Sequence, residues 1–179
     1  LDMQRFWRSS LLTGLAARAA AQAAAQPMAE RLFVIGVLSD IGHLVLYQTV
    51  PELAAMARRE AEAGKETLDA AERRVIGCDF AEVGAALMDR WQLPDRFAGA
   101  IGTQMLPRLG GAFAADAAAL HLARRIAEAD AKGEASTDAA ASVAADVWPL
   151  IGLAPEQLGA IREEAELNLA AYLALFFPR

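Results

Sequence analysis

The sequence is poor in the residues that build metal centres, disulfides and nucleic-acid-binding surfaces. It has two histidines and one cysteine among 179 residues. A His-rich metal site and an internal disulfide are therefore both excluded, and a lone thiol fits a reducing compartment. Acidic residues outnumber basic ones by 23 to 17, for a net charge of −6. Because nucleic-acid-binding proteins usually carry a basic face, we expect no nucleic-acid partner.

Long apolar runs without charge are also scarce. The most apolar ones, residues 41–51 and 167–178, are shorter than the roughly 18 to 20 residues of a membrane-spanning helix. No basic segment followed by an apolar one indicates a signal peptide. We therefore expect a cytoplasmic protein without a membrane partner. The chain starts at Leu1, which leaves open that an N-terminal part of the full-length protein precedes it.

Alanine is abundant, and apolar residues recur with helical periodicity along the chain. The hydrophobic content is 55%, and much of it is alanine, which favours helix. Apolar residues recur at the spacing of helical turns, and no segment alternates as a half-buried strand would. The sequence predicts an all-α fold, a bundle of about eight to ten helices. Pro27 is expected to start one helix, Asp79 and Glu82 to form a capping box, and Thr137 and Asp138 to cap a late helix to about Leu150.

The most apolar stretch, residues 33–46, contains three polar side chains near its middle: Ser39, Asp40 and His43. Apolar residues flank them on both sides, so some of these groups are expected at or near the core. A buried carboxylate needs a metal, a cation or several hydrogen-bond donors. The identity of the partner of Asp40 is therefore the central question.

Five short motifs occur in a characteristic order. They are FWRSS at 6–10, FVIGVLSDIGHLVL at 33–46, GCDFAEVGA at 77–85, WQLP at 91–94 and HLA at 121–123. In this order and spacing they resemble the HDOD domain family, the non-catalytic relatives of HD-type metal-dependent phosphohydrolases. The resemblance covers residues 6–130, and the helices expected in 137–179 are compatible with the family's tail. It implies a single HD-like domain over residues 1–179.

The resemblance also implies where the six metal ligands of catalytic HD relatives would fall. Only Asp40 keeps a ligand there, and His43 takes the place of a nearby lysine. Metals require imidazole or carboxylate lone pairs, which phenylalanine, methionine and arginine lack. We therefore expect no metal, no cofactor, no catalytic residue and no hydrolase activity. The five replaced ligand positions are Ser39, Phe80, Gln104, Met105 and Arg124.

The same replacements suggest what occupies the former metal site. Our hypothesis is that Asp40 and Arg124 form a buried ion pair there, with Phe80 and Met105 filling the vacated space. The alternative is that Arg124 faces solvent and Asp40 only caps a helix. His121 is expected to be structural, or to hydrogen-bond within the former site.

The resemblance implies a catalytically inactive signalling module of the bacterial cytoplasm. It would act through protein partners such as kinases, receivers or cyclic-dinucleotide enzymes. The alternative is a sensor pocket that binds a nucleotide or cyclic dinucleotide, with His43, Gln104, Arg124 and Arg125 as ligand contacts. The pair Arg58-Arg59 stands among acidic residues and is expected to mark a solvated face.

Two segments are candidates for a homodimer interface. Residues 16–25 are rich in alanine, which allows close approach either inside the domain or against another chain. The last helix is very apolar and either closes the domain's own core or forms an interface. Its apolar side chains are Leu169, Tyr172, Leu173, Leu175, Phe176 and Phe177.

Overall fold

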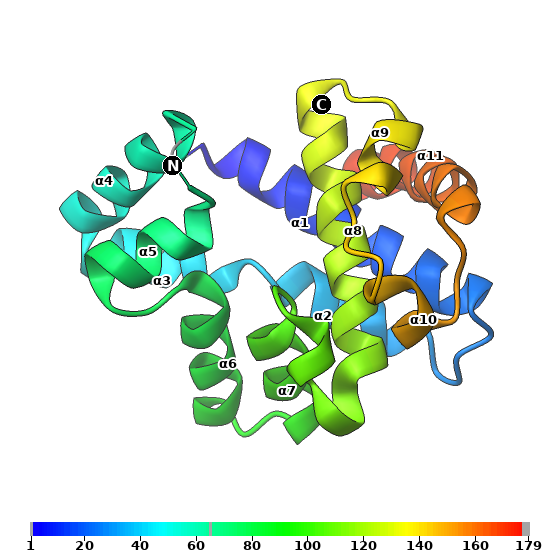
Figure 1. Ribbon diagram of the computed structural model, residues 1–179, viewed down its shortest axis with the longest axis horizontal. Coiled ribbons are helices and arrows are strands. Elements are labelled where there is room, and N and C mark those ends of the chain that lie inside the picture. Colours follow the sequence, from blue (N-terminus) through cyan, green and yellow to red (C-terminus); the bar gives the residue numbers. More distant parts are fainter. Residues whose placement is uncertain (1, 65, 177–179) are drawn as a thin grey trace.

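The computed structural model describes residues 2–64 and 66–176, and this part of the chain is helical with no strand (Figure 1). The predicted all-α, HD-like bundle is confirmed. Three single-turn 3₁₀ helices (Pro107–Leu109, Gly111–Phe113 and Pro155–Gln157) connect longer elements. The α-helices are α1 (Met3–Ala23), α2 (Glu30–Leu38), α3 (Ile41–Thr49), α4 (Pro51–Glu62), α5 (Leu68–Ile76), α6 (Phe80–Arg90), α7 (Asp95–Thr103), α8 (Ala114–Lys132), α9 (Ser136–Ala141), α10 (Val147–Ile151) and α11 (Leu158–Phe176).

The main hydrophobic core surrounds α1, which packs against α2, α8 and α11. Its alanines from Ala16 to Ala21 are buried in this core, so most of the alanine-rich segment packs inside the chain. At the crossing with α2, a Cβ added to Gly36 would lie 2.7 Å from the Cα of Gly14. The two helix backbones are therefore in direct contact.

The last helix covers the same core with part of its apolar surface. Leu169 is buried, and Tyr172 and Leu173 pack against the core, whereas Leu175 is 75% exposed. Phe177 and the side chain of Phe176 lie outside the described residues.

A second, smaller hydrophobic cluster joins α3, α4 and α6. Its buried members are Leu46, Ala54, Phe80 and Ala81. In Figure 1, α3, α4 and α5 lie together on one side of the molecule, away from α9, α10 and α11. Asp40 lies in the turn between α2, which ends at Leu38, and α3, which begins at Ile41.

Of the three predictions about helix ends, one is confirmed and two are wrong. The capping box of Asp79 and Glu82 is present, because each side chain accepts the backbone N–H of the other residue. Pro27 does not start a helix: α2 begins at Glu30, and Met28 adopts a φ of 58°. The capping residues and extent predicted for the late helix are also wrong.

That late segment forms two short helices instead of one. Helix α9 begins at Ser136 after Ala135, whose side chain has no capping atom, so Thr137 and Asp138 lie inside the first turn. The chain leaves helical geometry after Ala141 and resumes it at Val147. Buried Val143 and Trp148 fix this path against the core.

Residues Glu30–Thr49 form a 20-residue apolar stretch with a mean hydropathy of 1.4. By length and composition alone it could cross a membrane. This is weak support for a membrane span, because a buried core helix meets the same criterion, and here the stretch is interrupted at Ser39 and Asp40.

Gly42 allows α3 to contact α6. A Cβ added at this position would lie 1.9 Å from the carbonyl oxygen of Phe80 and 2.9 Å from the nitrogen of Gly84. We expect Gly42→Ala to lower the free energy of unfolding by about 3 kcal/mol or more, since neither backbone atom can move without displacing a helix. Urea denaturation measures this difference.

Gly159→Ala in α11 is the matched control. The nearest atom to its added Cβ, in Ser136, is 3.9 Å away. Helix propensity should then raise stability by up to about 1 kcal/mol. Equal stability of the Gly42→Ala protein and the wild type would contradict the described α3–α6 contact.

Candidate functional site

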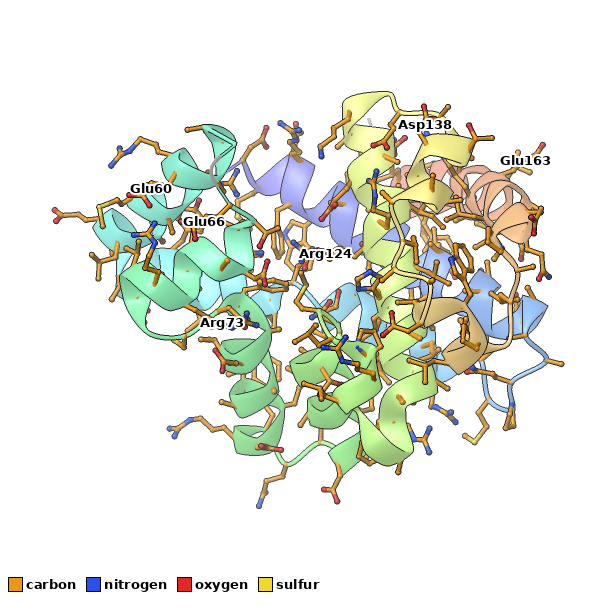
Figure 2. The ribbon with its side chains drawn as sticks, in the orientation of Figure 1. Glu60, Glu66, Arg73, Arg124, Asp138 and Glu163 are labelled. Carbon is orange, nitrogen blue, oxygen red and sulfur yellow. The ribbon has the colours of Figure 1, made fainter. Side chains whose placement is uncertain are left out.

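Asp40 and Arg124 form an ion pair at the junction of α2, α3 and α8. The Nη1 of Arg124 donates to Oδ1 of Asp40 over 2.9 Å, and the two side chains are only 15% and 17% exposed. Asp40 precedes α3, but its side chain makes no capping hydrogen bond. In Figure 2, Arg124 reaches from α8 toward the helices α3 and α5. The partner of Asp40 in this structure is thus a guanidinium.

A second carboxylate stabilises the same guanidinium. The Nε of Arg124 donates to Glu128, one turn further along α8, over 3.1 Å. Burial alone would lower the pKa of Arg124, but the charges of Asp40 and Glu128 outweigh it and raise the pKa above its usual value. Arg124 is therefore a permanent cation that is already neutralised.

The ring of Phe80 packs between Arg124 and His43. It is fully buried, stacks on the imidazole of His43 with 4.2 Å between ring centroids, and has the Cζ of Arg124 4.3 Å from its own centroid. A cation over an aromatic face gains electrostatic energy. Half-buried Met105 packs against the small cluster that contains Phe80. Phe80 thus contacts the cation in addition to occupying space.

Glu72 on α5 joins this group, although the sequence analysis gave it no role. One carboxylate oxygen accepts the backbone N–H of Phe80 over 2.9 Å. The other lies 3.0 Å from Nδ1 of His43, an ion-pair distance but out of line for a hydrogen bond. Glu72 therefore connects α5 with the start of α6 and with α3.

Gln104 and Ser39 connect helices without facing an open space. The buried amide of Gln104 donates to the carbonyl oxygens of Ser39 and Ile101 over 3.0 and 3.1 Å. The hydroxyl of Ser39 donates to the carbonyl of Gly36. The Nδ1 of His121 pairs with the backbone carbonyl of Gln104 over 2.9 Å. These residues hold α7, α8 and the α2–α3 junction together.

The side chains at the six positions expected from the resemblance do not suit a metal. Within residues 2–64 and 66–176, no three His, Cys, Asp or Glu side chains converge as a metal centre requires. A permanent cation stands 2.9 Å from the one remaining carboxylate, where it would repel a metal ion. The donor chemistry of the site thus disagrees with metal binding.

A cavity of about 600 Å³ opens beside the ion pair, between α1, α3, α4, α5 and α8. Asp40, His43 and Arg124 line it. Gln104 and Arg125 do not. The guanidinium of Arg125 instead pairs with Glu134, whose pKa is lowered by that contact, and with Ser142.

Other residues in the cavity wall carried no functional signal in the sequence. Arg58 and Arg59 are exposed, as expected of a solvated face, yet both line the cavity, and so do Arg5 and Thr13 of α1. Their helices are distant in the sequence. Only the fold shows that these side chains share a cavity.

The comparisons with known proteins agree with this architecture. The family model of the HDOD domain matches residues 1–107. Solved structures with a similar fold include the "Putative phosphohydrolase" from Shewanella amazonensis SB2B, with a TM-score of 0.76 and 22% identity over 97% of this chain and 65% of that one. No curated protein matches the chain.

Two further structures resemble it. The "Putative signal transduction protein" from Marinobacter aquaeolei VT8 has a TM-score of 0.77 at 22% identity, over 95% of this chain and 38% of that one. The MmoQ response regulator from Methylococcus capsulatus str. Bath has a TM-score of 0.61 at 25% identity, over 90% of this chain and 61% of its own. The chain thus spans less than two thirds of each of these solved chains.

The ion pair predicts strong coupling between its two members. Asp40→Asn and Arg124→Met should each lower the free energy of unfolding by about 2 to 4 kcal/mol, because Arg124→Met leaves Asp40 without a cation and Asp40→Asn leaves Arg124 with Glu128 alone. The double variant should cost less than the sum by at least about 1 kcal/mol. Urea denaturation of all four proteins measures this coupling.

The exposed pair Arg58 and Glu62, whose charged atoms are 4.0 Å apart, serves as control. Its coupling in an Arg58→Met and Glu62→Gln cycle should stay below about 0.5 kcal/mol. Additive and nearly neutral effects at Asp40 and Arg124 would show that the pair does not stabilise the site.

Proposed function

The chain belongs to the HDOD domain family, and from this premise we propose that it is a non-catalytic regulatory module of signal transduction in the bacterial cytoplasm. It would act by binding protein partners such as kinases, receivers or cyclic-dinucleotide enzymes. Two of the similar structures, described as a signal transduction protein and a response regulator, support a role of this kind.

One observation carries the non-catalytic part of the proposal. The single carboxylate that remains of the six expected metal ligands, Asp40, is bound by Arg124. Hydrolysis by HD-type chemistry needs a metal to polarise the phosphoryl group and to activate water. Here Asp40 is paired with the guanidinium of Arg124, which has no vacant coordination position that could polarise a phosphoryl oxygen or activate a water molecule.

Regulation without catalysis requires at least two arrangements that a partner can distinguish. A partner that binds one arrangement more tightly shifts the population toward it. The buried hydrophobic residues form two separate clusters. These clusters would be the two parts of the molecule whose relative arrangement differs between the states. The polar groups between them would transmit the preference of one cluster to the other.

The non-catalytic proposal predicts a negative result in two assays. The purified protein, incubated with excess Mn²⁺, Fe²⁺ or Zn²⁺ and then desalted, should retain well below one metal ion per chain by elemental analysis. It should not hydrolyse nucleotides or cyclic dinucleotides faster than Asp40→Asn. Stoichiometric metal, or hydrolysis that Asp40→Asn abolishes, would overturn the proposal.

The partner-binding part has its own test. Affinity capture from a bacterial lysate, followed by mass spectrometry, should enrich a kinase, a receiver or a cyclic-dinucleotide enzyme. Titration calorimetry with the purified candidate should then give a saturable 1:1 or 2:2 complex. If no candidate binds as a purified protein, the interaction proposal is wrong.

A second candidate function is a nucleotide or cyclic-dinucleotide sensor, which the cavity beside Arg124 and His43 favours. Its volume of about 600 Å³ lies within the usual range of small-molecule sites. A bound ligand would raise the melting temperature in proportion to its occupancy. A thermal-shift panel of nucleotides and cyclic dinucleotides tests this candidate independently of the metal assays, and a flat response across the panel would exclude it.

A further inference from the structure

Helix α11 has an apolar face that no other part of the described chain covers. It lies on the side of the molecule away from α3, α4 and α5 (Figure 1). Its exposed residues fall on one face, opposite the buried residues Ile161, Ala165 and Leu169. In the first turns this face is acidic, and from Leu167 onward it is apolar. The apolar part, called the α11 strip below, consists of Leu167, Ala170, Ala171, Ala174 and Leu175.

The α11 strip is unusual for the solvent side of a helix. The outward face of a surface helix is normally polar, whereas Leu167 and Leu175 are 71% and 75% exposed. Complete burial of a leucine side chain is worth about 1.5 to 3 kcal/mol. Covering the strip would therefore stabilise a complex.

The pattern of side-chain sizes in the strip is self-complementary. Leu167, Ala170, Ala171 and Ala174 follow one another at the spacing of helical turns. In an antiparallel pair with a two-fold axis between Ala170 and Ala171, Leu167 would face Ala174 of the second copy. Each large side chain would then meet a small one, as close packing requires. The alanines at the centre would let the two helices approach closely.

From this pattern we infer that the protein forms a symmetric homodimer through antiparallel pairing of α11 with α11 of a second copy. A two-fold interface uses the same surface on both chains, so it needs a surface that is complementary to itself. In this pair Leu175 would lie beside Leu167 of the second copy and cover its exposed flank. The inference is independent of the cavity and of the ion pair.

The charges of α11 favour the antiparallel orientation. Glu163 and Glu164 occupy the same face one turn before the strip and are exposed. The single arginine of the helix, Arg162, is already paired with Glu166 over 2.6 Å. A parallel dimer would bring the four exposed glutamates of the two copies together, which is unfavourable. An antiparallel dimer places them at opposite ends.

The face fits a second protein chain better than a lipid surface. Helices that lie on membranes carry lysine or arginine on their polar side, and none is among the exposed residues of α11 from Leu158 to Leu175. The strip is about 12 Å long, shorter than the interfaces of about 800 Å² per partner that hold stable complexes. We therefore expect a reversible dimer that depends on protein concentration.

Sedimentation velocity between about 5 and 500 µM protein tests the inference. The weight-average mass of the wild type should rise with concentration from that of one chain toward that of two. Leu167→Glu should weaken the dimer at least about tenfold, because each copy would place a carboxylate in the paired apolar face. The substituted side chain is exposed in the monomer, so circular dichroism should show unchanged helix content.

Leu109→Glu is the matched control. Leu109 is another exposed leucine, at 66%, and it lies in the 3₁₀ helix Pro107–Leu109, outside α11. The substitution makes the same change in charge and hydrophobicity. The Leu109→Glu protein should dimerise as the wild type does.

Disulfide cross-linking tests the orientation in a Cys78→Ser background, which removes the single native cysteine. A mixture of Leu167→Cys and Ala174→Cys proteins should form a mixed disulfide-linked dimer. Leu167→Cys alone should not cross-link. Its two copies would be offset by about 10 Å along the helix axis, beyond the separation of about 7 Å that a disulfide can span.

Three results would overturn the inference. The first is a wild type that remains monomeric at about 500 µM. The second is equal dimerisation of Leu167→Glu and Leu109→Glu. The third is efficient cross-linking of Leu167→Cys with itself, which would show a parallel pair. None of them bears on the non-catalytic proposal, because that rests on Asp40 and Arg124.

Discussion

The need to neutralise the guanidinium of Arg124 in a largely dry interior governs the structure around it. Two carboxylates and an aromatic face contact this cation. Glu128 lies on α8 itself, Asp40 in the turn between α2 and α3, and Phe80 on α6. An unpaired charge at this depth would cost several kcal/mol. The position of α3 and α6 relative to α8 is therefore constrained by one charge.

The fold class and the ion pair could both be predicted from the sequence, for different physical reasons. Helical periodicity is a local property that 179 residues express many times. Asp40 and Arg124 are far apart in the sequence. Their pairing could be predicted only because the order of the motifs resembles a family in which the metal ligands converge. The ends of the helices were harder to predict. Pro27 does not start a helix because Met28 adopts a φ of 58°, and α2 begins only at Glu30. The helix expected to reach Leu150 is divided because buried Val143 and Trp148 set the path of the chain there.

The roles of other residues of the site could not be predicted from the sequence. Glu72 looks like any acidic residue of an amphipathic helix, yet it is 3% exposed and accepts the N–H of Phe80. Arg59 has acidic neighbours in the sequence, but Glu60 pairs with Arg74 of α5 and Glu62 lies 4.0 Å from Arg58. The cavity is built from α1, α3, α4, α5 and α8, and only tertiary packing defines it.

The division of the hydrophobic residues into two clusters has a consequence for how the molecule opens. The larger cluster spans the chain from α1 to α11, whereas the smaller has four buried members supplied by α3, α4 and α6. Burial of so little apolar surface gives a low free energy of local opening. Amide hydrogens of α3 to α5 would therefore exchange with solvent through a partial unfolding in which α1, α8 and α11 stay intact. Stability would then differ between the two parts of the molecule, and the pair of Asp40 and Arg124 lies where they meet.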